Sequence, residues 1–295
     1  LTAGMPANAA DFKAGTWDMS VGGYVNAQLT NVKCTGNQAI GGAALATEGL
    51  GCAGQDARTT IGNGLLPSAL VTGAKTKQGS WDIGVTLMIG VHAATDSAIG
   101  ANSAVDVRQA FFTLGSGSGT FKIGRDYGSF GASAILGDMT LLGSGAPVQA
   151  TQRGRVTLGH IGAGYSYLGH YGQLSYASPD LGGLTFNAGL YSPVANGGTA
   201  LAGTMPQLQA GLAFKAGGMK AWAGAKSQKF EDTTNGNFTM NAAEVGGSFS
   251  LGGFELLANL QSGKGLGVLS DGDAGNVKQN NAFVQGTFAI TSDIK

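Results

Sequence analysis

The chain has little charge and no long apolar run. Lys, Arg, Asp and Glu make up 12% of its 295 residues, and 17 basic residues balance 17 acidic ones. Soluble proteins usually have a more charged surface, and zero net charge argues against a nucleic-acid partner. No apolar run reaches the roughly 18 residues of a membrane helix, so the sequence predicts no helical span. No fixed repeat period is present, which argues against a fibrous Gly-rich adhesin.

The sequence is rich in glycine, and in several segments apolar and polar residues alternate strictly. The chain has 53 Gly residues and a mean hydropathy of +0.09. From Trp17 to Leu29 the odd positions are apolar, whereas the even positions are almost all polar. The same period of two recurs in 81–91, 184–191 and 207–215, and it predicts long strands. Strands with one apolar and one polar face, without a helical span, are typical of a transmembrane β-barrel.

The connections between these segments alternate in length. Short Gly-rich turns lie at 76–80, 115–119, 178–183, 215–218 and 250–254, and long segments lie at 31–63, 92–104, 127–166, 192–205, 228–239 and 262–280. This pattern predicts periplasmic turns and external loops. Twelve strands are predicted, at 16–30, 65–76, 80–92, 104–115, 119–126, 167–178, 183–192, 206–216, 218–228, 239–251, 253–262 and 280–291.

The two ends suggest a mature but truncated chain. The opening "LTAGMPANAADFK" lacks the charged start and apolar stretch of a signal peptide. The closing "TFAITSDIK" lacks the final aromatic strand with which outer-membrane barrels normally close. We therefore expect residues 1–295 to form a single barrel domain that is incomplete at its C-terminus.

Two segments resemble the trimeric general porins of Gram-negative bacteria. They are "VRQAFFTLGSGSGTFKIGRDYGSF" at 107–130 and "GQLSYASPDLGGLTFNAGLYSP" at 172–193. The resemblance implies a sixteen-stranded antiparallel barrel, of which about four strands would lie beyond this chain. It also implies an outer-membrane homotrimer, in contact with lipid and lipopolysaccharide, that lets small hydrophilic solutes and ions diffuse passively without a cofactor. A substrate-specific channel with a solute-binding constriction is the alternative.

In this family the third long loop folds into the barrel, and the corresponding segment here is 127–166. Its apolar middle favours packing against an inner wall, and "SAILGDM" within it suggests a short helix. The resemblance implies that acidic loop residues face basic wall residues across the pore. Asp138 fits the acidic side and Arg125 the basic side, while Arg153 and Arg155 at the return of the loop would add positive potential.

The constriction is expected to be less acidic than usual, because Leu141 and Leu142 stand where a second carboxylate is often found. Weaker cation preference would follow. Four further charged residues have the strand parity of lumen-facing positions, namely Lys122, Lys220, Lys226 and Glu244.

Each constriction residue also has a simpler interpretation. Arg125 shares its strand parity with Phe121 and Ile123, so strict alternation would point it outward. A break beside Gly124 would turn it toward the lumen, which avoids a cost of about 2–4 kcal/mol for arginine facing mid-membrane lipid. Asp138 would otherwise only cap a loop helix. The two arginines at 153 and 155 would otherwise bind lipopolysaccharide or a neighbouring subunit at the rim.

Cys34 and Cys52 both lie in the first long loop and enclose 17 residues. Two cysteines in an exported chain predict a disulfide, which would stabilise the protein by about 3 kcal/mol on the loop-entropy model. No histidine lies near either cysteine, so no metal site is expected. An enzyme would need a base from His92, His160 or His170, and no nucleophile motif accompanies them.

Overall fold

The computed structural model describes residues 10–33, 39–40, 50–51, 56–63, 66–91, 105–140, 159–162, 164–196, 198–268 and 270–290. In these residues the fold is all-β and antiparallel apart from one short helix, α1 (Ala132–Gly137), which confirms the predicted fold class. Across the same ranges, no helix has the length and apolar character needed to cross a membrane.

Each predicted strand overlaps at least one strand of the structure. In chain order the strands are β1 (Ala10–Ala14), β2 (Trp17–Tyr24), β3 (Gln28–Lys33), β4 (Ala39–Ile40), β5 (Leu50–Gly51), β6 (Ala57–Gly62), β7 (Ser68–Gln78), β8 (Trp81–Val91), β9 (Asp106–Ser116), β10 (Gly119–Tyr127), β11 (His170–Ala177), β12 (Leu184–Tyr191), β13 (Ala200–Ala202), β14 (Gln207–Ala216), β15 (Met219–Asp232), β16 (Phe238–Leu251), β17 (Phe254–Lys264) and β18 (Lys278–Phe288).

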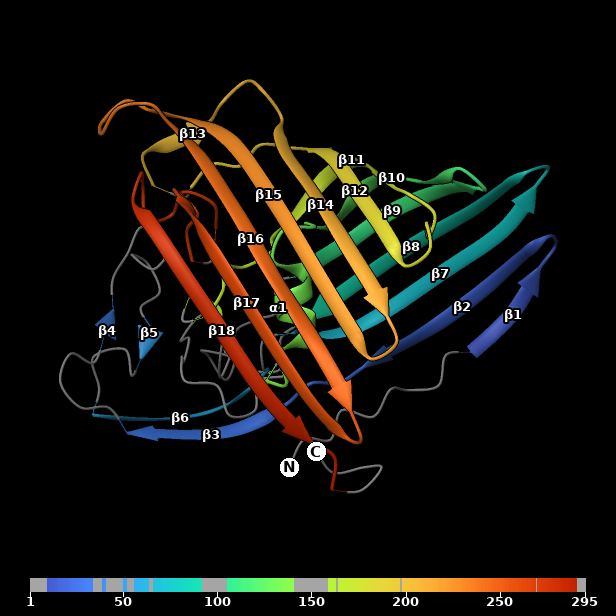
Figure 1. Cartoon of the computed structure of the whole chain (residues 1–295), viewed down its shortest axis with the longest axis horizontal. Helices are drawn as coiled ribbons and strands as arrows, with labels where there is room; N and C mark the ends of the chain where they lie inside the picture. The colour runs from blue at the N-terminus through green and yellow to red at the C-terminus, as the bar shows by residue number, and fades with distance from the viewer. Residues whose placement is uncertain are drawn as a thin grey trace. The chain divides into compact units, whose positions relative to one another are not determined.

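The chain forms two compact units, and β10 contributes residues to both. The first unit contains the neighbouring strands β1-β2-β7-β8-β9, and the pairs β3–β6 and β4–β5 form small separate sheets. The strand β7 pairs β8 without interruption from Ser68↔Val91 to Gln78↔Trp81, whereas the β8–β9 pair has a register shift between Met88 and Gly90. These strands are coloured blue to green in Figure 1.

The second unit contains the strand order β11-β12-β14-β15-β16-β17-β18, in which consecutive neighbours are antiparallel (Figure 1). Tight turns join some of these strands. Between β14 and β15 the chain reverses at Gly217, whose φ of +55° is a conformation that favours glycine. The long connections 192–206 and 265–277 lie at the other ends of the strands.

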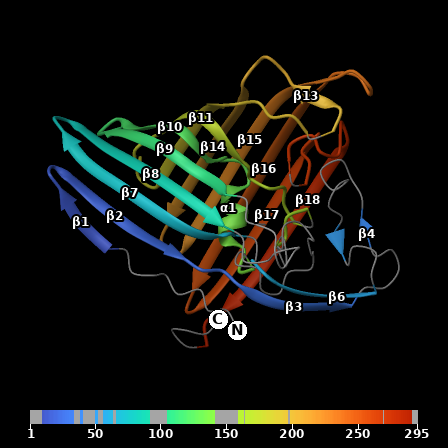
Figure 2. The same ribbon diagram turned by 180° about the vertical axis from the view of Figure 1, so that it is seen from behind.

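The strands of the second unit form a sheet, called the second sheet below, with an apolar exposed face and a polar buried face. A soluble protein has the opposite arrangement. One face carries exposed apolar side chains, including Leu208 (53% exposed), Val245 (56%) and Val284 (69%). The other face carries buried polar side chains, including Gln209 and Lys226. Figure 2 shows α1 on one side of this sheet, and the contacts below identify that side as the polar face. The polar face therefore holds the candidate site.

The predicted strand at 16–30 was too long. The structure ends β2 at Tyr24, and β3 pairs with β6 in a different sheet although the alternation continues in the sequence. Asn26 is buried at the break: its backbone N–H donates to Ser68 Oγ (3.0 Å) and its side chain donates to the Leu66 carbonyl (2.8 Å). These bonds to residues some 40 positions away divert the chain, and period-two patterning carries no signal for them.

Candidate functional site

A loop segment, residues 128–138, lies against the polar face of the second sheet. The Gln209 side chain on β14 is its first anchor. Gln209 Oε1 accepts hydrogen bonds from the backbone N–H groups of Ser129 (2.8 Å) and Phe130 (3.0 Å), and also from the Ser129 hydroxyl (3.2 Å). Buried backbone N–H groups need acceptors, and here a single side-chain oxygen supplies the acceptor for two consecutive amides.

Three further strands supply anchors of the same kind. Glu244 Oε1 on β16 accepts from Gly131 N–H (2.8 Å), and Gln285 Nε2 on β18 donates to the Gly137 carbonyl (2.9 Å). On the returning part of the connection, Gln261 Oε1 on β17 accepts from the N–H of Ser166 (2.8 Å). Long amide and carboxylate side chains thus tie the backbone of this connection to the polar face at several points.

The helix α1, "ASAILG", overlaps "SAILGDM", where the sequence suggested a helix, and Asp138 follows it as the C-cap residue. The Asp138 backbone N–H donates to the Ile135 carbonyl (3.2 Å). Its carboxylate is buried at 3% exposure and accepts a hydrogen bond from the Tyr165 hydroxyl (2.5 Å). Asp138 thus lies at the C-cap of α1 with a buried carboxylate, and its role at the constriction stays a prediction.

The predicted lumen-facing residues of this unit divide into two groups. Lys226 and Glu244 are both buried on the polar face, in agreement with their strand parity. Lys220 has the same parity but is exposed, because it is the second residue of β15 after the turn. Their effect on permeating ions stays a prediction.

Several residues of this face were missed from the sequence. Gln209 and Gln261 lie at inward parity and could have been selected by that signal, since both are long polar side chains able to reach a loop backbone. Asp271 gave no such signal. It lies in a segment predicted to be an external loop, yet its carboxylate is 3% exposed and bound by three side chains of the sheet.

Lys122 and Arg125 belong to the first unit and lie on opposite faces of β10. Lys122 forms an ion pair with buried Asp126, and its ammonium lies 4.9 Å from the ring centre of Phe111. Gln109 also donates to Asp126 (2.9 Å). Arg125 is exposed on the other face and its Nε donates to the Val107 carbonyl (2.8 Å).

The alternation of β10 is regular through Gly124. Phe121, Ile123 and Arg125 are exposed in turn, with less exposed residues between them. Gly124 itself has a φ of +125°, but Arg125 keeps the exposed position that strict alternation gives it. Its role at the constriction stays a prediction. The expected opposition of Arg125 and Asp138 involves two different units and stays a prediction.

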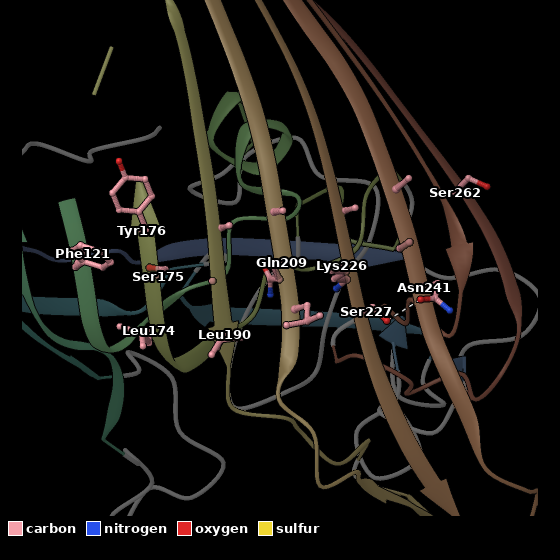
Figure 3. Close-up of a pocket in the computed structure, with 17 residues that line it drawn as sticks. Phe121, Leu174, Ser175, Tyr176, Leu190, Gln209, Lys226, Ser227, Asn241 and Ser262 are labelled. Atoms are coloured by element: carbon pink, nitrogen blue, oxygen red, sulfur yellow. Dashed lines mark hydrogen bonds between the residues drawn. The ribbon is translucent and has the colours of Figure 1, made fainter. Parts of the chain in front are cut away.

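A groove of about 840 Å³ lies in the second unit, largely on the apolar face (Figure 3). Small side chains, among them Ala188, Ala210 and Ala243, form its floor between larger ones such as Leu174 and Leu208. At one side Ser227 Oγ donates to Asn241 Oδ1 (2.8 Å; dashed line in Figure 3). Most of its lining residues have the parity of the apolar face, although Gln209 and Lys226, which belong to the polar face, also line it.

Four predicted residues, Arg153, Arg155, Cys34 and Cys52, lie outside the described residues, as does the whole segment 141–158 with Leu141 and Leu142. The rim or constriction role of the arginines and the disulfide stay predictions. Within the ranges that the structure describes, no group of three His, Cys, Asp or Glu side chains is placed to hold a metal ion.

Comparison with solved structures finds outer-membrane channels. The anion-selective porin from Comamonas acidovorans is 18% identical, with a TM-score of 0.64 over 93% of this chain and 75% of that chain. The outer membrane channel DcaP of Acinetobacter baumannii is 15% identical, with a TM-score of 0.62 over 96% and 78%. OmpF of Salmonella typhi, solved with daunomycin, is 15% identical, with a TM-score of 0.57 over 87% and 68%.

At these identities the structural likeness shows the fold alone. No match was found among curated proteins. The family model described as Gram-negative porin, in contrast, matches residues 1–294. The chain therefore belongs to the Gram-negative porin family and is a β-barrel protein of the outer membrane.

Proposed function

We propose that the protein is a passive, water-filled channel for small hydrophilic solutes and ions, and that the segment 127–166 narrows it. The polar face of the sheet is the wall of the lumen in this proposal. The observation that carries it is the attachment of the segment 128–138 to that face by Gln209, Glu244 and Gln285. A wide barrel leaves an aqueous channel, so an inward loop is the element that sets its width.

The apolar face supports the membrane half of the same proposal. Exposed side chains such as Leu212, Val245 and Leu260 would meet lipid, as the outward band of a barrel does. We further propose a homotrimer in contact with lipid and lipopolysaccharide, on the resemblance to trimeric porins. Cross-linking in detergent, followed by electrophoresis of unheated samples, tests the trimer: a monomer at all cross-linker concentrations would refute it.

Planar-bilayer recording of the refolded protein tests the channel itself. We expect stepwise current increases whose size rises in proportion to the conductivity of the salt solution, because ions would move through water. Heat-denatured protein is the control. Preparations that fold, as judged by electrophoretic mobility, but never give current steps would refute the channel.

The same recordings separate general diffusion from substrate binding. A general pore shows no saturable block by added sugars or small organic acids. A channel with a solute-binding constriction is blocked by its solute with a defined half-saturating concentration, and that outcome would establish the alternative.

A further inference from the structure

The described part of the connection between β17 and β18, residues 265–268 and 270–277, also lies against the polar face, and we call it the second loop. Its base is closed by the hydrogen bond from Gly265 N–H to the Val277 carbonyl (2.9 Å). Its middle residue Asp271 is buried, although the segment was expected to lie outside. An external loop has no need to bury a carboxylate, because water solvates such a group without cost.

Three strands of the sheet bind the Asp271 carboxylate. Lys226 on β15 forms an ion pair with Oδ1 at 2.5 Å, with side-chain exposures of 0% and 1%. Gln207 Nε2 on β14 and the Tyr171 hydroxyl on β11 donate to Oδ2 at 2.7 and 2.8 Å. A buried charge is tolerated only when it is paired and hydrogen-bonded, and both conditions hold here.

Lys226 is also the point at which the second loop meets the segment 128–138. Its ammonium lies 5.0 Å from the ring centre of Phe130, the neighbour of Ser129 in that segment. In the sheet, Lys226 is the register partner of Gln209, which accepts from the Phe130 amide. Asp271 therefore binds the wall at the same height along the strands as Gln209, which anchors the segment 128–138.

Backbone contacts join the two loops as well. The backbone N–H of Tyr167, near the end of the connection that contains the segment 128–138, donates to the Val268 carbonyl of the second loop (3.0 Å). Asn196, on the connection after β12, donates through Nδ2 to the Gly272 carbonyl (3.1 Å). The second loop is thus held at its tip by the wall and at its flanks by two other connections.

We propose that the second loop is a second narrowing element of the pore, and that Asp271 is the positioning residue that holds it there through Lys226. The inference rests on the proposed channel function and extends it, because it makes the size limit for neutral solutes depend on two loops. Loss of either partner leaves an unpaired buried charge, so the loop would leave the wall to rehydrate it.

The test compares Asp271→Asn, Lys226→Met and the double variant with wild type. Glu231→Gln is the matched control, since it removes one carboxylate near the same end of β15 from the face opposite to Lys226. Two readouts are needed: single-channel conductance, and liposome swelling in neutral sugars of increasing size. Neutral sugars report the width of the pore without responding to its charge.

We expect each single variant to raise the conductance and to admit larger sugars, with no further increase in the double variant, because both changes release the same loop. Glu231→Gln should leave the sugar limit unchanged. Folding of each variant is checked by its electrophoretic mobility before heating. Tyr171→Phe removes one hydroxyl donor to Asp271, and it should give a smaller shift of the same sign even if the charge variants fail to fold.

Folded variants with the wild-type sugar limit would overturn the role of the second loop while leaving the channel intact. Additive effects of the two single variants would also overturn it, because they would mean independent actions. Absence of any current from the wild-type protein would instead refute the channel, so the two failures are distinguishable.

Discussion

Gln209→Ala should release the segment 128–138 from the wall. The substitution removes the acceptor of two backbone amides, those of Ser129 and Phe130. A buried donor left without a partner costs about 1–3 kcal/mol, so two of them cost about 2–6 kcal/mol. Water in the lumen would hydrogen-bond to the two amides in part, so we expect the cost to lie near the lower end of this range. A free-energy change of about 1.4 kcal/mol alters an equilibrium constant tenfold. A cost of about 2 kcal/mol therefore raises the population of released segment about thirtyfold.

Hydrogen exchange measures this population directly. The amides of Ser129 and Phe130 should exchange about thirty times faster in the variant, since exchange follows local opening. Single-channel traces should show added current noise as the loop moves.

Asn187→Ala is the matched control. Asn187 lies on the polar face of β12, and its Oδ1 is buried without a hydrogen-bond partner within the described structure. Its loss should therefore leave the loop amides protected. Equal exchange rates for Gln209→Ala and Asn187→Ala would show that the loop is held by packing and not by the Gln209 anchor.

Lys122→Gln should shift the reversal potential in a salt gradient toward cations, whereas Arg125→Gln should not, because the two side chains lie on opposite faces of β10. A shift with Arg125→Gln alone would show that this residue reaches the pore. Thiol titration of unreduced, unfolded protein should detect neither Cys34 nor Cys52, and replacing both by serine should lower stability by about 3 kcal/mol if the loop-entropy model holds. Gly124→Ala should destabilise the folded protein by at least about 1–3 kcal/mol in urea unfolding, since φ is +125° and an added Cβ would lie 2.4 Å from a carbonyl oxygen of β9. An unchanged unfolding midpoint would contradict the strain at this position.

Period-two alternation was enough to find the long strands of the main sheet, because it is a local property of each segment, but it missed the short strands β1, β4, β5, β6 and β13. The strand predicted at 80–92 becomes β8, Trp81–Val91, and its faces follow from parity alone. The same rule placed Lys226 and Glu244 on the polar face. The lack of a long apolar run also argued against a helical span, and two segments indicated the porin family through their resemblance to it.

Contacts between distant segments decided the rest, and no local pattern encodes them. Asn26 ends β2 through bonds to residues near 66–68, so the strand stopped before its alternation did. Asp271 looked like a residue of an external loop, but Lys226, 45 positions earlier, holds it against the wall. Alternation assigns each side chain to one face of the sheet. Only the folded sheet shows which loop covers that face and which polar groups of the loop form hydrogen bonds with it.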